Sequence, residues 1–219
     1  MSRLYDDAHR ALQDVFGSRA LADRIEDVAM STTVDDQAQA FIESRDLFFL
    51  SSLDAAGRPT VSYKGGPRGV VRVVDEQTLA FPNYDGNGMY LSMGNARARA
   101  EVGLLFIDFE TPHRLRVQGR AEVSRDDPLM ETFPEADLLV RVHIHELWQN
   151  CPRYIHRYRR VADSRYVPTP GQTTPLAGWK RIEGLQDVLD AEDRSRAEAA
   201  GRISEDTWID QIKRGDPEA

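Results

Sequence analysis

The stretch Leu47–Gly65, LFFLSSLDAAGRPTVSYKG, contains two runs of β-branched and aromatic residues on either side of a short turn sequence. The runs are LFFLSSL and RPTVSYKG, and such composition favours β-strands. The connecting residues, DAAGRP, combine Asp, Gly and Pro, which is typical of a hairpin turn. We therefore predict that two antiparallel strands begin the sheet of this protein here.

Four further runs of the same kind follow along the chain. They are GVVRVVD (69–75), TLAFPN (78–83), VGLLFIDF (102–109) and RLRVQGRAEV (114–123). Only one helical pattern, at about 89–100, interrupts them. Six strands with mostly short connections predict an antiparallel barrel or sandwich, so the expected fold class is α+β and mainly antiparallel β.

The residues before the first strand have helical periodicity. Leu4, Ala8, Leu12, Val15 and Phe16 recur at helical spacing, and the pattern resumes at 20–30 after a Gly-Ser break. A third helix is expected near residue 38, with Thr33 or Asp35 as its N-cap. We therefore treat residues 1–45 as an N-terminal helical segment.

The residues after Pro128 are harder to interpret. Residues 140–160 mix helix and strand signals, so their type stays open at this stage. Residues 183–219 hold eleven acidic residues against five Lys and Arg, which favours either an amphipathic helix pair or a partly ordered tail. The expected division is a barrel domain at 46–168 and a C-terminal helical, acidic extension at 169–219.

Composition excludes some classes of function. The net charge of −8 and the pI of about 5.2 argue against general nucleic-acid binding. Cys151 is the only cysteine, so an internal disulfide is impossible and a reducing compartment is expected. No run reaches membrane-spanning length, and the N-terminus has no apolar core of a signal peptide. We expect a cytoplasmic protein without membrane association.

The loop Asn83–Tyr90, NYDGNGMY, has more glycine and asparagine than a hairpin turn requires. Glycine allows positive φ and close backbone approach, and Asn tolerates the left-handed region. Because a helical pattern follows, the free N–H groups at its start could bind a phosphate. The alternative is a plain connecting loop.

A second signal is a basic, glycine-rich segment, SYKGGPRGVVRVV, which contains Lys64, Arg68 and Arg72. Arg72 shares a predicted strand face with valines, so its charge needs a partner or an anionic ligand. The alternatives are a side chain that reaches solvent and an ion pair with Asp75 or Glu76.

Histidines and Cys151 could indicate a metal centre, but their spacing does not support one. His113, His143, His145 and His156 show neither zinc-finger nor HExxH spacing. No metal site is therefore expected. The basic, aromatic segment RYIHRYRR (153–160) favours a subunit interface or pairing with the acidic tail over single-stranded nucleic acid.

In combination these motifs resemble the flavin-binding split-barrel superfamily of the pyridoxamine 5'-phosphate oxidases, in the branch of predicted flavin-nucleotide-binding proteins. The resemblance covers about residues 38–160. It is carried by GRP in the first hairpin, the Lys-Gly segment, VRVVD, the Asn-Gly loop, VGLLF, RLRVQG and NCPRYIH.

The resemblance implies a six-stranded split β-barrel with flanking helices, which forms a homodimer with FMN at the subunit interface. The cofactor-binding residues that it implies are Lys64, Gly65, Arg72, Asn83, Gly86, Asn87 and Gly88. Lys64, Ser51 and Arg116 are the candidate polar partners of the flavin ring. A positive group near the ring would stabilise the reduced flavin.

Two departures from the family pattern limit the expected activity. Gly-Asn-Gly stands where the oxidases carry an SRK-like triplet, and the chain ends RGDPEA instead of an Arg-rich motif. Oxidation of pyridoxine phosphate is therefore not expected. The expected function is an FMN-dependent oxidoreductase acting on an unidentified small molecule. The alternatives are a non-catalytic flavin store, sensor or electron carrier, or a relative that binds F420 or haem.

Overall fold

The computed structural model describes residues 2–218, which form two compact units that divide between Arg159 and Arg160. Each unit is described by itself. The expected domain boundaries, at 45/46 and 168/169, stay predictions.

The first unit begins with helices, as the periodicity predicts. They are α1 (Asp7–Val15), α2 (Arg19–Ala29) and α3 (Asp36–Glu43), with the two-residue strand β1 (Met30–Ser31) before α3. Asp35 is the N-cap of α3, where its carboxylate accepts a hydrogen bond from the Ala38 N–H at 2.7 Å. This bond satisfies one of the free donors at the helix start.

An antiparallel sheet follows, and the six predicted strands are present. The elements of the sheet and its single inserted helix are β2 (Leu47–Leu53), β3 (Pro59–Gly65), β4 (Arg72–Asp75), β5 (Thr78–Tyr84), α4 (Leu91–Ala98), β6 (Glu101–Asp108), β7 (His113–Ser124) and β8 (Ala136–Asn150). β2 and β3 pair from Leu47↔Gly65 to Leu53↔Pro59, which confirms the predicted hairpin.

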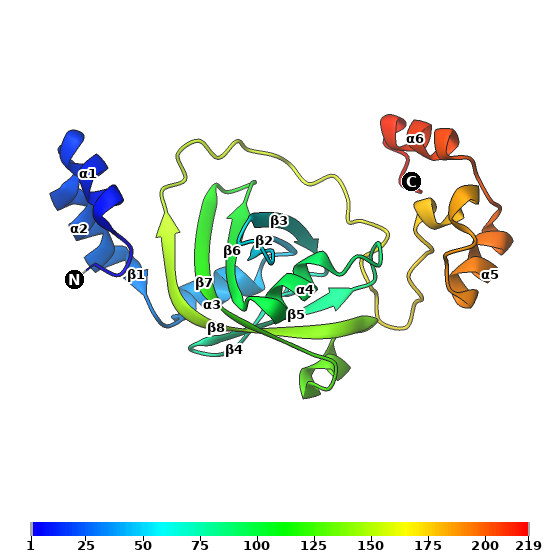
Figure 1. The fold of residues 1–219 in the computed structure, drawn as a ribbon, viewed down its shortest axis with the longest axis horizontal. Helices are drawn as coiled ribbons and strands as arrows, with labels where there is room; N and C mark the ends of the chain where they lie inside the picture. Colours follow the sequence, from blue (N-terminus) through cyan, green and yellow to red (C-terminus); the bar gives the residue numbers. More distant parts are fainter. Residues whose placement is uncertain (1, 219) are drawn as a thin grey trace. The chain divides into compact units, whose positions relative to one another are not determined.

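The sheet has the strand order β3-β2-β6-β7-β8-β5-β4, and β1 adds a short pairing to β8. β3 and β4 lie at the two ends of this order, so the barrel is split between them. Figure 1 shows α3 and α4 against the curved sheet. The interior contains Phe48, Phe81 and Phe106, which are fully buried, and the Phe48 ring pairs with each of the other two.

The number of strands differs from the six expected, because β8 was not assigned from the sequence. This fifteen-residue strand pairs with β5 and β7, and together with the two-residue β1 it brings the sheet to eight strands. Val142 and Ile144 are buried, whereas His143 and His145 are exposed, so the segment does alternate with a period of two. Its flanking residues have helix-compatible composition, which conceals the alternation. Between β7 and β8 lies a short 3-10 turn, η1 (Pro128–Thr132).

The second unit contains the 3-10 turns η2 (Gly178–Arg181) and η3 (Glu183–Leu185) and the helices α5 (Ala191–Ala200) and α6 (Glu205–Arg214). The acidic segment is therefore the helix pair, the first of its two alternatives. A buried ion pair between Lys180 Nζ and Asp193 Oδ2, 2.6 Å apart, connects η2 to α5. None of the described helices is long and apolar enough to cross a bilayer.

Candidate functional site

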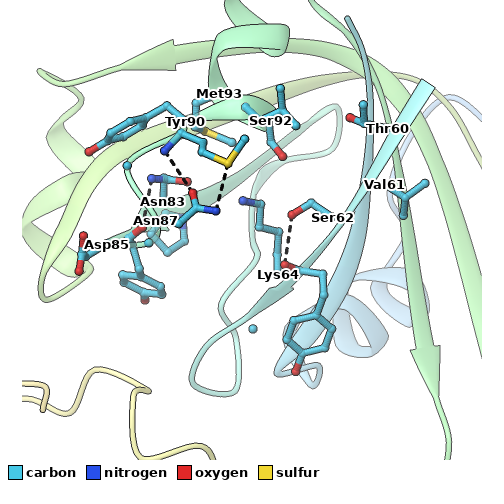
Figure 2. A pocket seen from close by; sticks show the side chains of 18 of the residues that line it. Thr60, Val61, Ser62, Lys64, Asn83, Asp85, Asn87, Tyr90, Ser92 and Met93 are labelled. Carbon is cyan, nitrogen blue, oxygen red and sulfur yellow. Dashed lines mark hydrogen bonds between the residues drawn. The ribbon is translucent and has the colours of Figure 1, made fainter. Parts of the chain in front are cut away.

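A cavity of about 430 Å³ lies beside the open edge of the barrel (Figure 2). Its walls are β3 (residues 60–65), the end of β5 and the following loop (82–90), and the first turn of α4 (91–93), with Phe48 and Val70. Five of the predicted cofactor residues therefore come together here with Lys64: they are Gly65, Asn83, Gly86, Asn87 and Gly88.

The loop between β5 and α4 presents backbone atoms to this cavity. Gly88 has φ +72°, which glycine adopts without strain, and Tyr90 has φ 46°. A Cβ added at Gly86 or Gly88 would meet no described atom within 4 Å. The Asn87 side-chain oxygen accepts a hydrogen bond from the Met89 N–H at 3.1 Å, which fixes the turn. The glycines therefore keep this wall free of side chains.

The first turn of α4 closes one end of the cavity. Among residues 2–218, no side chain forms a capping hydrogen bond at Tyr90, the N-cap of α4. The first N–H groups of a helix have no partner within the helix, and they carry the positive end of its dipole. Asn95, further along α4, donates a buried hydrogen bond to Ser52 Oγ at 3.2 Å and so attaches the helix to β2.

Asp137 holds the loop in place, and sequence analysis did not identify it. Its two carboxylate oxygens accept hydrogen bonds from Asn83 Nδ2 at 2.8 Å and from Tyr90 Oη at 2.7 Å. The bond to Asp137 raises the pKa of Tyr90. Asp137 lies at the start of β8, the strand whose type was left open. Asn83 thus positions the loop through Asp137.

Lys64 is the one Lys or Arg among the described residues that line this cavity. Burial lowers the pKa of its ammonium group, and the negative charge of Asp137 opposes this effect. Figure 2 shows the side chain extending from β3 towards Asn87 and the start of α4. A partly buried cation beside open N–H groups is an arrangement that favours an anion.

Tyr84 adds a second hydrogen-bond donor with unused capacity. Its hydroxyl is buried without a hydrogen-bond partner among the described residues, and burial raises its pKa to about 12. A buried donor without a partner is costly, so its presence in a cavity wall is evidence for a ligand or ordered water. Sequence analysis gave no signal for this role.

Three predicted cofactor residues lie outside this cavity. The Arg72 guanidinium donates to the Thr132 carbonyl at 2.9 Å and lies 4.0 Å above the Phe133 ring. Its partners are therefore a backbone carbonyl and an aromatic ring, and Arg72 does not line the cavity. Ser51 and Arg116 line a second cavity, of about 350 Å³, on the sheet. Val61 lines both cavities, which makes them neighbours along β3.

The histidines do not converge on Cys151. His143 and His145 lie near Glu122 and Glu101 on the exposed side of β8. His113 stacks on Phe41 with ring centroids 4.1 Å apart. Cys151 is exposed and shares with His113 a third cavity, of about 440 Å³. Over residues 2–218 no three His, Cys, Asp or Glu side chains form a group that could hold a metal.

The curved antiparallel sheet, open between β3 and β4, defines a split-barrel protein. Within that class, the family model for pyridoxamine 5'-phosphate oxidase matches residues 34–151, more than half of the chain. The chain belongs to this family.

Three solved structures illustrate what the chain is similar to. A candidate pyridoxamine 5'-phosphate oxidase from Lactobacillus delbrueckii is 27% identical, with a TM-score of 0.43 over 54% of this chain and 95% of that chain. An FMN-binding protein from Syntrophomonas wolfei is 11% identical, with a TM-score of 0.39 over 64% and 97%. HutZ, the heme storage protein from Vibrio cholerae, is 20% identical, with a TM-score of 0.40 over 52% and 94%. The search of curated proteins found no match.

Proposed function

We propose that this protein binds FMN at the open edge of the barrel and acts as a flavin-dependent oxidoreductase on a small molecule. The observation that carries this proposal is the position of Lys64. Its ammonium group is partly buried, its pKa is lowered by burial, and it extends towards the glycine loop and the first turn of α4. This group needs an anion, and the phosphate of FMN is one.

The residues present fit a phosphate. The first N–H groups of α4, for which the described residues supply no side-chain cap, would donate to its oxygens, and Lys64 would supply a positive charge. The Tyr84 hydroxyl offers a further donor that now has no described partner. Asp137 would keep the loop in its binding conformation through Asn83 and Tyr90.

The neighbouring cavity fits the remainder of the cofactor. Because Val61 lines both cavities, a molecule held at the loop can extend across β3 towards Ser51 and Arg116. The Arg116 charge would then favour electron-rich, reduced flavin. FMN supplies hydride-transfer chemistry when bound. The chain would bind and orient it, and a second copy covering this side of the sheet would exclude water.

A specific observation favours the alternative of flavin binding without turnover. Among the described residues lining the larger cavity there is no histidine, and burial moves the pKa of Tyr84 far above neutral pH. A neutral-pH proton donor or acceptor other than Lys64, which the proposal assigns to the phosphate, is therefore not evident among the described histidines and tyrosines of this cavity.

Two measurements test the proposal. The first is the absorbance spectrum and mass of any small molecule released when the purified protein is denatured. FMN is expected. The proposal would be contradicted if F420, haem or no cofactor-sized molecule is released and the protein also fails to bind FMN on reconstitution. The second is stopped-flow reduction by NADH or NADPH followed by reoxidation by oxygen. Bound FMN that is not reduced by either donor would favour the store, sensor or carrier.

A homodimer is part of the same proposal. Light scattering is expected to give about twice the monomer mass of 24.8 kDa at micromolar concentration. A mass equal to that of the monomer would contradict it.

A further inference from the structure

The N-terminal arm, residues 7–29, is a pair of helices packed through polar side chains. Arg10 on α1 forms an ion pair with Asp23 on α2 at 2.6 Å, and Arg19 on α2 forms one with Asp14 on α1 at 2.6 Å. No residue of either helix is buried. The contact between the two helices is therefore made by charged groups.

The large apolar residues of the arm are exposed, and one of them, Val28, also lines the third cavity beside β8. Large side chains recur at intervals of one helical turn, at 12, 15 and 16 in and directly after α1 and at 21, 25 and 28 in α2. Their exposed fractions are Leu12 62%, Val15 76%, Phe16 78%, Leu21 63%, Ile25 47% and Val28 73%. An amphipathic helix normally buries its apolar face. In the arm, the apolar side chains face outwards and charged side chains lie between the two helices.

Such an arm needs a constant partner. Helices of nine and eleven residues are too short to be stable without tertiary packing. The ion pairs hold the two helices together but bury no apolar area. A partner that is always available during folding is another copy of the same chain.

We propose that the apolar faces of two arms pair with each other and join two copies of this protein. Exposed apolar area on the order of 100 Å² per side chain gives roughly 1,200 Å² for the twelve side chains, the lower end of stable interfaces. A membrane surface is disfavoured, because the arm carries five acidic residues, three Arg and no Lys. The pairing is isologous, with the same surface used on both copies.

The arm is attached to the barrel, so arm pairing links two barrels. Met30 and Ser31, which follow α2, pair with Trp148 and Leu147 of β8. Arg3 forms an ion pair with Glu146 at 3.3 Å. This surface is separate from the two cavities of the proposed function, and it does not depend on a cofactor.

Site-directed cross-linking tests the pairing. In a Cys151→Ser background, Val15→Cys places a single thiol on the apolar face, and a short bis-maleimide is expected to give a covalent dimer. Leu21→Glu should remove this product, because two lost leucines per dimer weaken the association roughly 100- to 10,000-fold. Ala20→Glu, on the adjacent exposed position of the same helix, is the matched control and should leave the yield unchanged.

Hydrogen exchange of residues 7–29 provides a second measurement on the unmodified chain. Protection that rises with protein concentration, and is lost in Leu21→Glu but kept in Ala20→Glu, is the expected result. If the amide protection does not depend on protein concentration and no cross-linked dimer forms, the proposal is overturned, and the arm packs within one chain. A dimer by light scattering without the cross-link would also overturn it, while leaving a barrel-mediated homodimer intact. None of these readouts contains FMN, so failure of the cofactor proposal is detected separately.

Discussion

Replacing Lys64 with methionine tests whether the positive charge of this side chain binds the FMN phosphate. Methionine keeps much of the length and apolar volume of lysine but removes the positive charge. Lys64 is the one cation among the described lining residues, so the substitution leaves the cavity with only neutral donors. A hydrogen bond to a charged group is worth about 1.5–3 kcal/mol, so FMN should bind roughly 10- to 150-fold more weakly.

Riboflavin provides the internal comparison, because it lacks the phosphate. Its dissociation constant should change by less than about threefold in Lys64→Met, a difference below roughly 0.7 kcal/mol. Arg68→Met is the matched control: it removes one positive charge four residues away, at an exposed position outside the cavity lining. Fluorescence quenching of both flavins by the wild type and the two variants measures the six dissociation constants.

The stability of the variant distinguishes lost binding from misfolding. Burial lowers the pKa of Lys64, so the charged form is disfavoured in the folded protein. The free energy of unfolding without flavin should therefore stay the same or rise in Lys64→Met. In the wild type, FMN affinity should fall as Lys64 loses its proton, in a window that begins below the ordinary value of 10.5. Equal losses for FMN and riboflavin, or unchanged FMN affinity in folded variant protein, would refute the assignment.

Three further substitutions test other features. Gly88→Ala should weaken FMN binding roughly 5- to 30-fold, because a side chain at φ +72° costs about 1–2 kcal/mol and the loop relaxes when flavin is absent. The control is Gly57→Ala, at φ +79° in the first hairpin, which should lose a similar free energy of unfolding in denaturant but keep its FMN affinity. The pKa of Tyr84 is raised to about 12, so the folded state keeps the phenol proton above pH 10, where the unfolded chain loses it. The free energy of unfolding should therefore fall by up to about 3 kcal/mol between pH 10 and 12. Tyr84→Phe should lack this fall, and its absorbance titration should lack one phenol that ionises late. Arg72→Ala should lower the free energy of unfolding by about 1–3 kcal/mol through its contacts with residues 132 and 133, with FMN affinity kept; a selective loss of FMN over riboflavin would instead support the sequence-based assignment of Arg72 to the phosphate.

Local signals predicted most of the fold. The hairpin Leu47–Gly65 was predictable because its strands and turn are adjacent in sequence. β8 was not, since its alternating core, 140–147, is flanked by residues that also suit a helix. For the cavity, the glycine loop was predicted from its composition and the helical pattern after it, and Lys64 from the family resemblance. Asp137 and Tyr84 were missed because their roles depend on contacts between distant segments, which a single sequence does not encode locally.

Arg72 illustrates a second limit. The valine-rich strand indicated that the Arg72 charge needs solvent or a partner, and the partners considered were sequence neighbours or a ligand. The partner is η1, sixty residues away, which offers a carbonyl and an aromatic ring. An apolar strand face predicts that a cation on it finds a partner or solvent, but it does not identify which part of the chain supplies the partner.

The position of β8 in the strand order has a consequence for synthesis on the ribosome. β4 and β5 connect to the remainder of the sheet through β8, as do β2, β3, β6 and β7 from the other side. A nascent chain that has not yet emerged beyond residue 135 can therefore form only two separate ladders, with unpaired edges on β5 and β7. The same late segment brings Asp137, so the loop between β5 and α4 can acquire its anchor only when the barrel itself is completed. With the proposed function, flavin capture during translation would wait until the last strand has emerged, and arrested chains ending before residue 136 should be sensitive to proteolysis with or without FMN.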